Sequence, residues 1–500
     1  LFVECPISGF PPTFKHSDSF LRDYKHALDD AVLNYMESSF LSFSNLVDVN
    51  KLWSRFKAIV LHCESSYVPF KKKCINREHP WMNRDLIHLK RKTKRCRKRG
   101  DKKRLQSLVH IFHEKMHVAR DHFFSSTLFS FITDQPEKFW CYLSKDKKSI
   151  TEIKTSDGTT DNAAVIAQSL NAFFQSVFTR TASHAHLPAY TLVKHMPKVY
   201  SSKEGIFSLL CKLDTKKSPG PDDISNVFLS RYAIWVSEYL YKIYVTSLET
   251  CVIPDDWRSA RIVPIHKSGS PLESNNYRSV SLTSTACKLL EHIIFKAIMT
   301  HLEDNKLLHD NQHGFRSGLS TSTQLAEITH DFANSLNFKG QIDAVFLDFS
   351  KAFDAVIHND FITKLSAIGV DQNIVRWVAC YLSSRKQYVM VNDDVSDSLD
   401  VHSGVPQGSV LAPLLFLVYI NDIYFSVQSP VKIRPFANDC VIYADIVQHS
   451  DQARLNDALQ SICTWCGKRG LKLNISKTAS ITVTNKQNPL EFQYTINNAY

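Results

Sequence analysis

The sequence predicts a protein of mixed helix and strand, in which a mainly helical region of about 200 residues precedes a domain of α/β or α+β type. Within residues 18–62, apolar residues recur at three- and four-residue intervals with charges between them, which is typical of amphipathic helices. Beyond residue 200, short β-type runs alternate with helical segments, and turn residues become more frequent. A chain of 500 residues with 44% hydrophobic content can bury a core and favours at least two structural units.

The helical pattern resumes at residues 105–145, where "FFSSTLFSFI" and "EKFWCYL" are rich in aromatic residues. We expect these aromatic side chains to belong to a helical core. The stretch "DNAAVIAQSLNAFFQSVF" begins with capping residues and continues with an apolar face, which predicts a capped amphipathic helix. The first domain is therefore assigned to residues 1–200 and the second to residues 201–500.

A basic block at residues 84–104 holds twelve Lys or Arg and two Asp, so it supplies +10 of the net charge of +11. Such a block favours a polyanionic partner, because neutralised phosphates release counterions. A solvated helix face or a nuclear-import signal would have the same composition. Five of its residues are candidate nucleic-acid-binding residues: Lys90, Arg91, Lys92, Lys94 and Arg95.

The twelve cysteines are scattered, and the single CxxC at Cys463 and Cys466 has no second ligand pair, which argues against a zinc site. Unpaired thiols fit a reducing compartment. No apolar run reaches the roughly 20 residues that cross a bilayer, and no signal peptide opens the chain. We therefore expect an intracellular protein without a membrane partner, and a chain that begins at Leu1 is expected to be a fragment.

Two acidic stretches of the second domain are candidates for catalysis. In "AVFLDFSKAFDAV", an apolar run of strand type ends at Asp348, although the residue could instead cap a helix formed by "SKAFDAV". "FANDC" lies between "KIRP" and "VIYAD", so it predicts a tight hairpin whose tip carries Asn438 and Asp439. Asx residues also favour turns for local reasons. Together, two strand-end acidic sites in a basic protein predict a two-metal phosphoryl-transfer centre, with two Mg²⁺ ions as cofactors.

Other polar residues could bind a nucleotide. Residues 261–283 predict two strands around a polar turn, with Lys267 and Arg278 as a clamp for a triphosphate, unless they are ordinary surface charges. "SGVPQGSVLAPLLFLVYINDI" predicts a loop that leads into a buried apolar helix. Gly404 and Gly408 would allow close backbone approach there. Gln407 between them suits a base or a sugar, and an ordinary loop is the alternative.

The second domain resembles the reverse transcriptases of non-LTR, LINE-type retrotransposons over about residues 205–485. The motifs that carry the resemblance occur in the family's order: "SPGPDDI", "PIHKSGS", "NNYRSVSLT", "QHGFRSGLST", "VFLDFSKAFDAV", "SGVPQGSVLAPLLFLVYINDI", "FANDC" and "GLKLNISKT". The resemblance implies an α+β, right-hand polymerase fold with fingers and palm, and a thumb largely beyond Tyr500. It also implies that residues 1–200 are similar to the linker between endonuclease and polymerase. The implied partners are an RNA template, a DNA primer and deoxynucleoside triphosphates (dNTPs), in the nucleus and the cytoplasm.

The resemblance assigns a role to each matching residue. Asp348 corresponds to the first catalytic aspartate, and the main-chain carbonyl of Phe349 to a metal ligand. Phe353 corresponds to the aromatic gate that rejects a ribose 2′-hydroxyl, with core packing as its alternative. Further residues correspond to nucleotide contacts: Lys267 and Arg278 to phosphate contacts, Gln407 to a contact near the incoming nucleotide and template, and Lys477 to the basic residue that assists departure of pyrophosphate.

The sequence departs from the family's pattern at three positions. The hairpin of the family reads Phe-Ala-Asp-Asp, whereas this chain has Asn438 at the first aspartate and retains Asp439. Asp223 occupies a position where glycine is frequent, and Ser279 one where proline is usual. Two functions follow: an RNA-directed DNA polymerase impaired by Asn438, or a catalytically inactive nucleic-acid-binding remnant of such an element.

Overall fold

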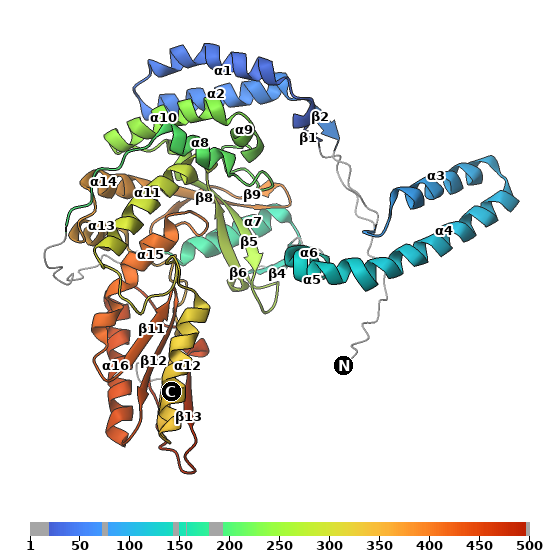
Figure 1. Ribbon diagram of the computed structural model, residues 1–500. Helices are drawn as coiled ribbons and strands as arrows, with labels where there is room; N and C mark the ends of the chain where they lie inside the picture. The colour runs from blue at the N-terminus through green and yellow to red at the C-terminus, as the bar shows by residue number, and fades with distance from the viewer. Residues whose placement is uncertain (1–19, 73–78, 144–149, 157, 180–193, 497–500) are drawn as a thin grey trace. The chain divides into compact units, whose positions relative to one another are not determined.

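The computed structural model describes residues 20–72, 79–143, 150–156, 158–179 and 194–496 (Figure 1). The described residues fall into two compact units. Unit 1 lies within Leu1–Asp23 and Phe70–Ser149, and unit 2 within Tyr24–Pro69 and Ile150–Tyr500. This division does not coincide with the domain boundary expected near residue 200, because the helices of residues 24–69 pack into the same core as the later domain.

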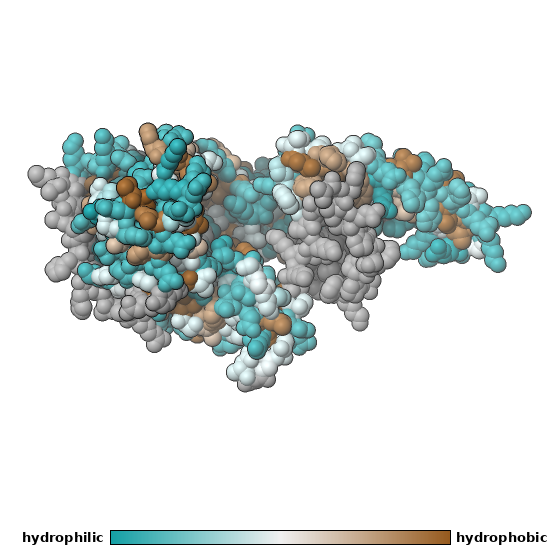
Figure 2. Space-filling view, turned by 90° about the horizontal axis from the view of Figure 1, so that it is seen from below, coloured by the Kyte–Doolittle hydropathy of each residue, from teal (hydrophilic) through white to brown (hydrophobic). Residues whose placement is uncertain are grey.

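Unit 1 contains a long helical hairpin. Helix α3 (Arg84–Arg99) and helix α4 (Lys102–His122) are joined by Gly100, whose φ of +79° ends α3 in the left-handed conformation that favours glycine. Asn83 accepts a hydrogen bond from the Leu86 N–H, and Asp101 accepts one from the Arg104 N–H, so both helices begin with a side-chain cap. Hydrophilic residues cover most of the far end of this hairpin (Figure 2).

Shorter elements complete unit 1. The strands β1 (Phe20–Arg22) and β2 (Phe70–Lys72) pair in antiparallel register. A π-helical turn (Phe123–Thr127), α5 (Leu128–Asp134) and α6 (Pro136–Leu143) follow α4. The helices were predicted, but the expectation of an aromatic core is only partly correct. Phe123 is buried, whereas Phe129 and Trp140 are 68% and 65% exposed.

In unit 2, the first helices cover α10 (Ala233–Thr250). Helices α1 (Asp29–Ser44) and α2 (Val49–Tyr67) contact it through fully buried side chains such as Met36 and Phe56. The Tyr239 hydroxyl donates to the main-chain oxygen of Met36 at 2.6 Å, which satisfies a buried polar group within this contact. The amphipathic pattern expected at residues 18–62 is therefore confirmed for α1 and α2, whose apolar faces are buried, but not for its first part, because Phe20–Arg22 forms a strand and residues 18–19 lie outside the described residues.

The first large sheet of unit 2 has the strand order β10-β8-β5-β6, with β9 paired to β8. The strands β5 (Ser259–His266) and β6 (Tyr277–Leu282) form an antiparallel hairpin, as the sequence predicted. β8 (Arg385–Val391) runs parallel to β5, and β9 (Asp394–Val395) and β10 (Leu399–Val401) extend the sheet. Helix α7 (Ala163–Ser176), capped by Asn162 as predicted, packs on this sheet through Ile166 and Leu170.

The second large sheet is antiparallel and has the strand order β11-β12-β7-β13. It consists of β11 (Lys432–Phe436), β12 (Asp439–Asp445), β7 (Gln341–Asp348) and β13 (Ala479–Thr484). Apolar residues of β7 and β12, including Ala344 and Val441, pack against α12 (Thr321–Asn337). β7 is therefore a central strand whose last residue, Asp348, leaves the sheet at one end.

The remaining helices and strands surround these two sheets. They are β3 (Ile153–Thr155), β4 (Gly158–Thr160), α8 (Lys203–Cys211), α9 (Asn226–Arg231), α11 (Thr285–Asp304), α13 (His358–Ala367), α14 (Gln372–Leu382), α15 (Ala412–Ile420) and α16 (His449–Lys468). Helix α15 is buried along its whole length except Pro413, as its composition predicted. The buried Glu291 carboxylate accepts hydrogen bonds from the Val410 and Leu411 N–H groups at 2.7 and 3.1 Å, which fixes the start of α15. No helix among the described residues combines the length and apolarity needed to span a bilayer.

Candidate active site

Two carboxylates meet where β7 ends and β12 begins. Asp348 is the last residue of β7, Asp439 is the first residue of β12, and the antiparallel register places them directly opposite each other. Such pairs have Cβ atoms about 4.5 to 5.5 Å apart. Partial desolvation and the Asp348 carboxylate raise the pKa of the Asp439 carboxyl. Like charges held this close favour a cation between them. Residues 350–354, just after Asp348, form turns and not a helix, so the alternative that Asp348 caps a helix formed by "SKAFDAV" is wrong.

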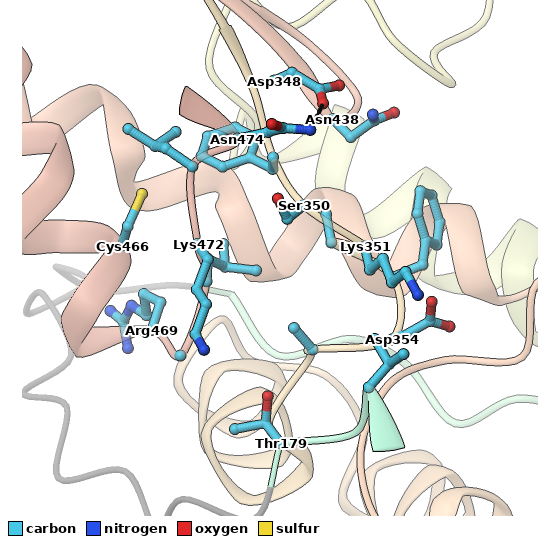
Figure 3. A pocket seen from close by; sticks show the side chains of 18 of the residues that line it. Thr179, Asp348, Ser350, Lys351, Asp354, Asn438, Cys466, Arg469, Lys472 and Asn474 are labelled. Carbon is cyan, nitrogen blue, oxygen red and sulfur yellow. Dashed lines mark hydrogen bonds between the residues drawn. The ribbon is translucent and has the colours of Figure 1, made fainter. Parts of the chain in front are cut away.

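Asn438 lies beside this pair, in the turn that joins β11 to β12. The side chains of Asp348 and Asn438 are neighbours at one edge of a cavity (Figure 3). Ala437 takes a φ of +55°, and the Asn438 main-chain oxygen accepts a hydrogen bond from the Phe349 N–H at 3.4 Å. A Cβ at Gly314 would lie 2.8 Å from the Ala437 nitrogen, so glycine lets its loop rest on the turn. The hairpin was predicted, but its turn is Ala437 and Asn438, because Asp439 already belongs to β12.

The segment after α16 holds Asp348 in place. The Asn474 N–H donates to the main-chain oxygen of Asp348 at 2.8 Å, and the Asn474 side-chain amide donates to the Asp348 carboxylate at 3.3 Å. Leu473 forms a β-bridge with Phe349, and the Ser350 N–H donates to the Lys472 oxygen at 2.8 Å. Sequence reasoning missed Asn474, although it lies in the quoted motif "GLKLNISKT", because an asparagine there carries no signal of its long-range partner.

Three cationic side chains converge on the carboxylates. Lys477 Nζ lies 3.3 Å from an Asp348 carboxylate oxygen. Lys267 directly follows β5 and Arg278 lies on β6, opposite Ile265. Desolvation, Lys477 and Arg278 lower the pKa of Lys267, while Lys267, Lys477 and Arg278 each act to lower the pKa of Asp439. These mutual effects mean that the predicted phosphate contacts and the predicted acidic pair occupy one electrostatic environment.

One cavity of about 2550 Å³ collects most of the predicted residues. It is lined by Lys267, Arg278, Asp348, Phe349, Phe353, Gln407, Asn438 and Lys477. These residues come from positions up to 210 apart in the sequence. Asp439 lies opposite Asp348 but is not part of the lining. The candidates of the basic block belong to unit 1, where all five are exposed on α3.

Phe353 lies between aromatic side chains at the cavity wall. Its ring stacks on Phe416 with a centroid distance of 4.5 Å, and Phe315 meets it edge-on at 6.5 Å. It is half-buried. This placement is compatible both with core packing and with a wall that touches a bound sugar.

Gln407 is held from two sides. Its main-chain oxygen accepts a hydrogen bond from the Ser281 N–H of β6 at 2.7 Å, and its side-chain amide nitrogen donates to both carboxylate oxygens of Asp354 at 3.0 Å. Gly408 has a φ of +118°, and a Cβ there would lie 2.7 Å from the Ser281 oxygen, so the close approach predicted for this glycine is confirmed. Sequence reasoning missed Asp354, whose only signal was a carboxylate within the apolar "AFDAV".

The structure gives a local explanation for one of the two milder departures, Asp223, and none for Ser279. Asp223 takes a φ of +58°, in the left-handed region that glycine adopts without strain and that Asp tolerates better than most residues. Ser279 pairs with Pro264 in the β5–β6 hairpin and lines the cavity.

The oxygen atoms at the acidic end suit a hard divalent cation. The available ligands are the carboxylates of Asp348 and Asp439, the amide oxygen of Asn438 and the main-chain carbonyl of Phe349. Hard cations such as Mg²⁺ prefer oxygen ligands and need few carboxylates when substrate phosphates complete the shell. An aspartate at position 438 would add a third negative charge. Across the described part of the chain, no group of three or more His, Cys, Asp or Glu side chains is arranged to hold a metal ion. The pair Cys463 and Cys466 is therefore not joined there by a third such side chain.

Comparison with known proteins identifies similar sequences. Residues 265–495 match the family model described as reverse transcriptase (RNA-dependent DNA polymerase). The chain is 32% identical over 291 residues to the probable RNA-directed DNA polymerase from transposon BS of Drosophila melanogaster. This alignment covers 57% of this chain and 32% of that protein. It is 26% identical over 428 residues to the RNA-directed DNA polymerase from mobile element jockey of Drosophila funebris. That alignment covers 80% of this chain and 46% of the relative.

The chain spans about a third to a half of the length of these relatives. Among solved structures, an apo telomerase from Candida tropicalis, truncated from its C-terminal domain, aligns with a TM-score of 0.35 and 15% identity. That alignment covers 47% of this chain and 52% of the telomerase chain.

Proposed function

We propose that the chain, which matches the reverse transcriptase family model over residues 265–495, is the polymerase part of an RNA-directed DNA polymerase of a non-LTR retrotransposon. In this proposal the protein binds an RNA template and a DNA primer and adds nucleotides from dNTPs. The observation that carries the proposal is the joint position of an opposed Asp348–Asp439 pair and the cations Lys267, Arg278 and Lys477.

The acidic end would hold the metal. We assign Asp348, Asp439 and the main-chain carbonyl of Phe349 to two Mg²⁺ ions, with Asn438 as a weak substitute for a third carboxylate. Bound ions of this kind activate the attacking hydroxyl and stabilise the leaving oxygen in phosphoryl transfer. Asn474 supports the assignment, because its two hydrogen bonds keep the Asp348 carboxylate and backbone oriented toward the cavity.

The cationic side chains would bind the triphosphate. Lys267 and Arg278 approach the acidic pair from the β5–β6 hairpin, and Lys477 approaches from the segment after α16. A triphosphate that spans them would be drawn toward the primer end and oriented by charge-assisted hydrogen bonds. Lys477 lies beside the Asp348 carboxylate, so it is placed to move onto a phosphate oxygen and to support the departure of pyrophosphate.

The opposite wall would select the nucleotide. Phe353 presents an aromatic surface that is fixed by Phe416, which suits a gate against the 2′-hydroxyl. Gln407 presents a polar group close to that surface. In this assignment the β5–β6 hairpin belongs to the fingers and the sheet β11-β12-β7-β13 to the palm, as in a right-hand polymerase.

Asn438 supports a second candidate function for this particular chain. An amide supplies one weak ligand oxygen and no negative charge, so metal binding and turnover should both be reduced. The alternative is a nucleic-acid-binding remnant that retains the cavity and the basic helix α3 without catalysis. The two candidates differ in whether restoring one charge restores chemistry.

The experiment is primer extension on an RNA template with Mg²⁺ and dNTPs. The unchanged chain should extend weakly or not at all, and Asn438→Asp should raise the rate by about 10² to 10³, since single preorganised electrostatic contacts are commonly worth that much. The change is nearly isosteric, so template-primer binding should be similar in both proteins. Asp348→Asn in the restored protein should abolish extension again.

A matched control is Asp445→Asn in the restored protein, because Asp445 is exposed at the other end of β12. It should leave the extension rate within about twofold, as expected for a surface substitution away from the site. If the Asn438→Asp protein binds template-primer and remains inert, the polymerase proposal fails for this chain and the binding remnant is the correct function.

A further inference from the structure

Two loops that border the cavity are joined by a dense set of hydrogen bonds. The Val405 N–H donates to the Phe353 oxygen and the Gly404 N–H to the Val356 oxygen, both at 2.8 Å. The Ser403 hydroxyl donates to the Asp354 main-chain oxygen at 2.7 Å. A Cβ at Gly404 would lie 2.7 Å from the Asp354 Cα, so no side chain fits between the loops. The backbone around Asp354 therefore has little freedom to move.

The Asp354 side chain uses this fixed position to hold Gln407. Gln407 Nε2 lies 3.0 Å from both carboxylate oxygens of Asp354, and both residues line the cavity. An ionised carboxylate only accepts hydrogen bonds, so it selects the NH₂ end of the amide. A glutamine without such a partner could present either end to the cavity. The carboxylate removes this ambiguity and leaves Oε1 as the end that the amide offers to a ligand.

The main chain of Gln407 is fixed independently. Its oxygen accepts the hydrogen bond from the Ser281 N–H, and Gly408 rests against the Ser281 oxygen. Gln407 is thus attached to β6 by its backbone and to the loop after β7 by its side chain. Phe353, the neighbour of Asp354, lines the same cavity. The position of the amide is therefore tied to both walls of the proposed nucleotide site.

Resting on the proposed function, we infer that Asp354 is a positioning residue of the nucleotide site: it orients the Gln407 amide so that Oε1 accepts a hydrogen bond from the incoming dNTP. Asp354 does not touch the nucleotide in this arrangement. Its effect passes through Gln407 alone. A change at Asp354 should weaken nucleotide binding and leave template-primer binding intact.

The test measures dNTP binding without chemistry. The chain is bound to an RNA template and a DNA primer that ends in a dideoxynucleotide, and the next complementary dNTP is titrated with Mg²⁺ while retention of the complex against a heparin competitor is followed. Asp354→Asn keeps the shape of the side chain but lets either end of the Gln407 amide face it. We expect dNTP affinity to fall by about tenfold, the loss that corresponds to one misplaced hydrogen bond.

The same titration separates positioning from a general structural effect. In a Gln407→Ala background, Asp354→Asn should cause no further loss, because the residue has nothing left to orient. An equal loss in both backgrounds would overturn the inference. Asp445→Asn is the matched control and should not change dNTP affinity, since that carboxylate is exposed at the far end of β12. Template-primer affinity reports whether each variant is folded.

A second measurement needs no variant of Asp354. Burial raises the pKa of Asp354 to about 6. The hydrogen bond from Gln407 and the positive charge of Lys351 act in the opposite direction and lower this pKa. His358 is a further titratable group at this junction; its Nε2 lies 2.7 Å from the Gly404 oxygen, and burial lowers its pKa. Above pH 6 the ionised Asp354 carboxylate accepts hydrogen bonds from the NH₂ group of Gln407. Below pH 6 the protonated carboxyl can also donate, so it no longer selects the NH₂ end of the amide.

Affinity for dNTP should therefore fall between pH 7 and pH 5 more steeply in the unchanged chain than in Gln407→Ala, which shares every other titrating group. Parallel pH profiles, or an unchanged affinity in Asp354→Asn, would overturn the inference while the proposed function stands. If the unchanged chain binds template-primer but no dNTP, the proposed function fails and the inference fails with it.

Discussion

Single residues decide whether this cavity can support catalysis. Asp348 and Asp439 are placed opposite each other by strand register, and their mutual repulsion is offset by Lys477, Lys267 and Arg278. Asn438 lies at the same edge without a charge. The balance of charge is therefore shifted toward the cations, which favours binding of an anion over binding of metal ions.

Phe353 permits a direct test at this scale. Its ring is fixed by Phe416 and lines the cavity, so a smaller side chain would open space where a sugar would bind. In the Asn438→Asp protein, Phe353→Ala should raise the incorporation of ribonucleotides relative to dNTPs by about tenfold or more, the range expected when a specificity pocket is enlarged. Single-nucleotide extension with paired rNTP and dNTP gives this ratio.

Phe332→Ala is the control, because Phe332 on α12 packs against Tyr443 and does not line the cavity. It should lower stability without changing the ratio. If Phe353→Ala also leaves the ratio unchanged, Phe353 is a core residue and no gate.

Sequence reasoning singled out candidate site residues but not the residues that hold them in place. Asp348 was singled out because it ends a strand-like run, and Lys267 and Arg278 because they are two cations on one predicted hairpin. Asp354 and Asn474 were not, because their importance depends on hydrogen bonds to Gln407 and Asp348, which lie 53 and 126 positions away. Local pattern indicates the strand on which a residue lies, and long-range packing decides what it touches.

At the scale of elements, the two hairpins and the strand β7 were predicted correctly, and their registers bring the site together. Period-two alternation and turn residues identify strands, but they do not specify which strands become neighbours. The pairing of β12 with β7 joins residues 91 to 103 positions apart. Likewise, the parallel pairing of β8 with β5 had no signature in the sequence.

The loop before α15 depends on a glycine. Gly408 has a φ of +118°, and an added Cβ would lie 2.7 Å from the main-chain oxygen of Ser281. Gly408→Ala should therefore lower the free energy of unfolding by about 1 to 3 kcal/mol, the range for a strained backbone position. Urea unfolding followed by circular dichroism measures this change.

Gly467→Ala is the matched control, because Gly467 lies inside α16 with nothing within 4 Å of an added Cβ. Alanine is the better helix former, so this variant should be unchanged or more stable by up to about 1 kcal/mol. Equal stability of both variants would show that the contact between the loop and β6 is not constrained.

For the whole molecule, composition and periodicity predicted a mixed helix-and-strand chain with a helical first part, and both are confirmed. The division into compact units was harder to foresee. Residues 24–69 lie early in the chain but pack against α10, because the apolar faces of α1 and α2 match a surface formed more than 160 positions later. The basic helix α3 instead belongs to a separate unit, and its five candidate residues are exposed.

This separation leads to a prediction about how the chain binds RNA. Flexible Lys and Arg side chains contact phosphates and do not read the bases. We therefore expect α3 to add affinity for RNA without preference for any base sequence. Replacing five of its cations by glutamine should lower affinity for single-stranded RNA and flatten its salt dependence, by about 0.7 in log-log slope for each phosphate that is no longer neutralised. The residues to replace are Lys90, Arg91, Lys92, Lys94 and Arg95. Filter binding at increasing KCl concentration gives the slope.

The control removes the same charge from elsewhere in the chain. Five other lysines, most of them exposed, are replaced by glutamine: Lys212, Lys242, Lys296, Lys306 and Lys339. If α3 is a binding surface, the slope should change far more in its variant than in this control, because only local cations displace counterions from the RNA. If the slope changes by the same small amount in both variants, the effect is one of net charge, and α3 is a solvated helix face. A slope that does not change in the α3 variant would exclude this helix as a nucleic-acid-binding surface altogether.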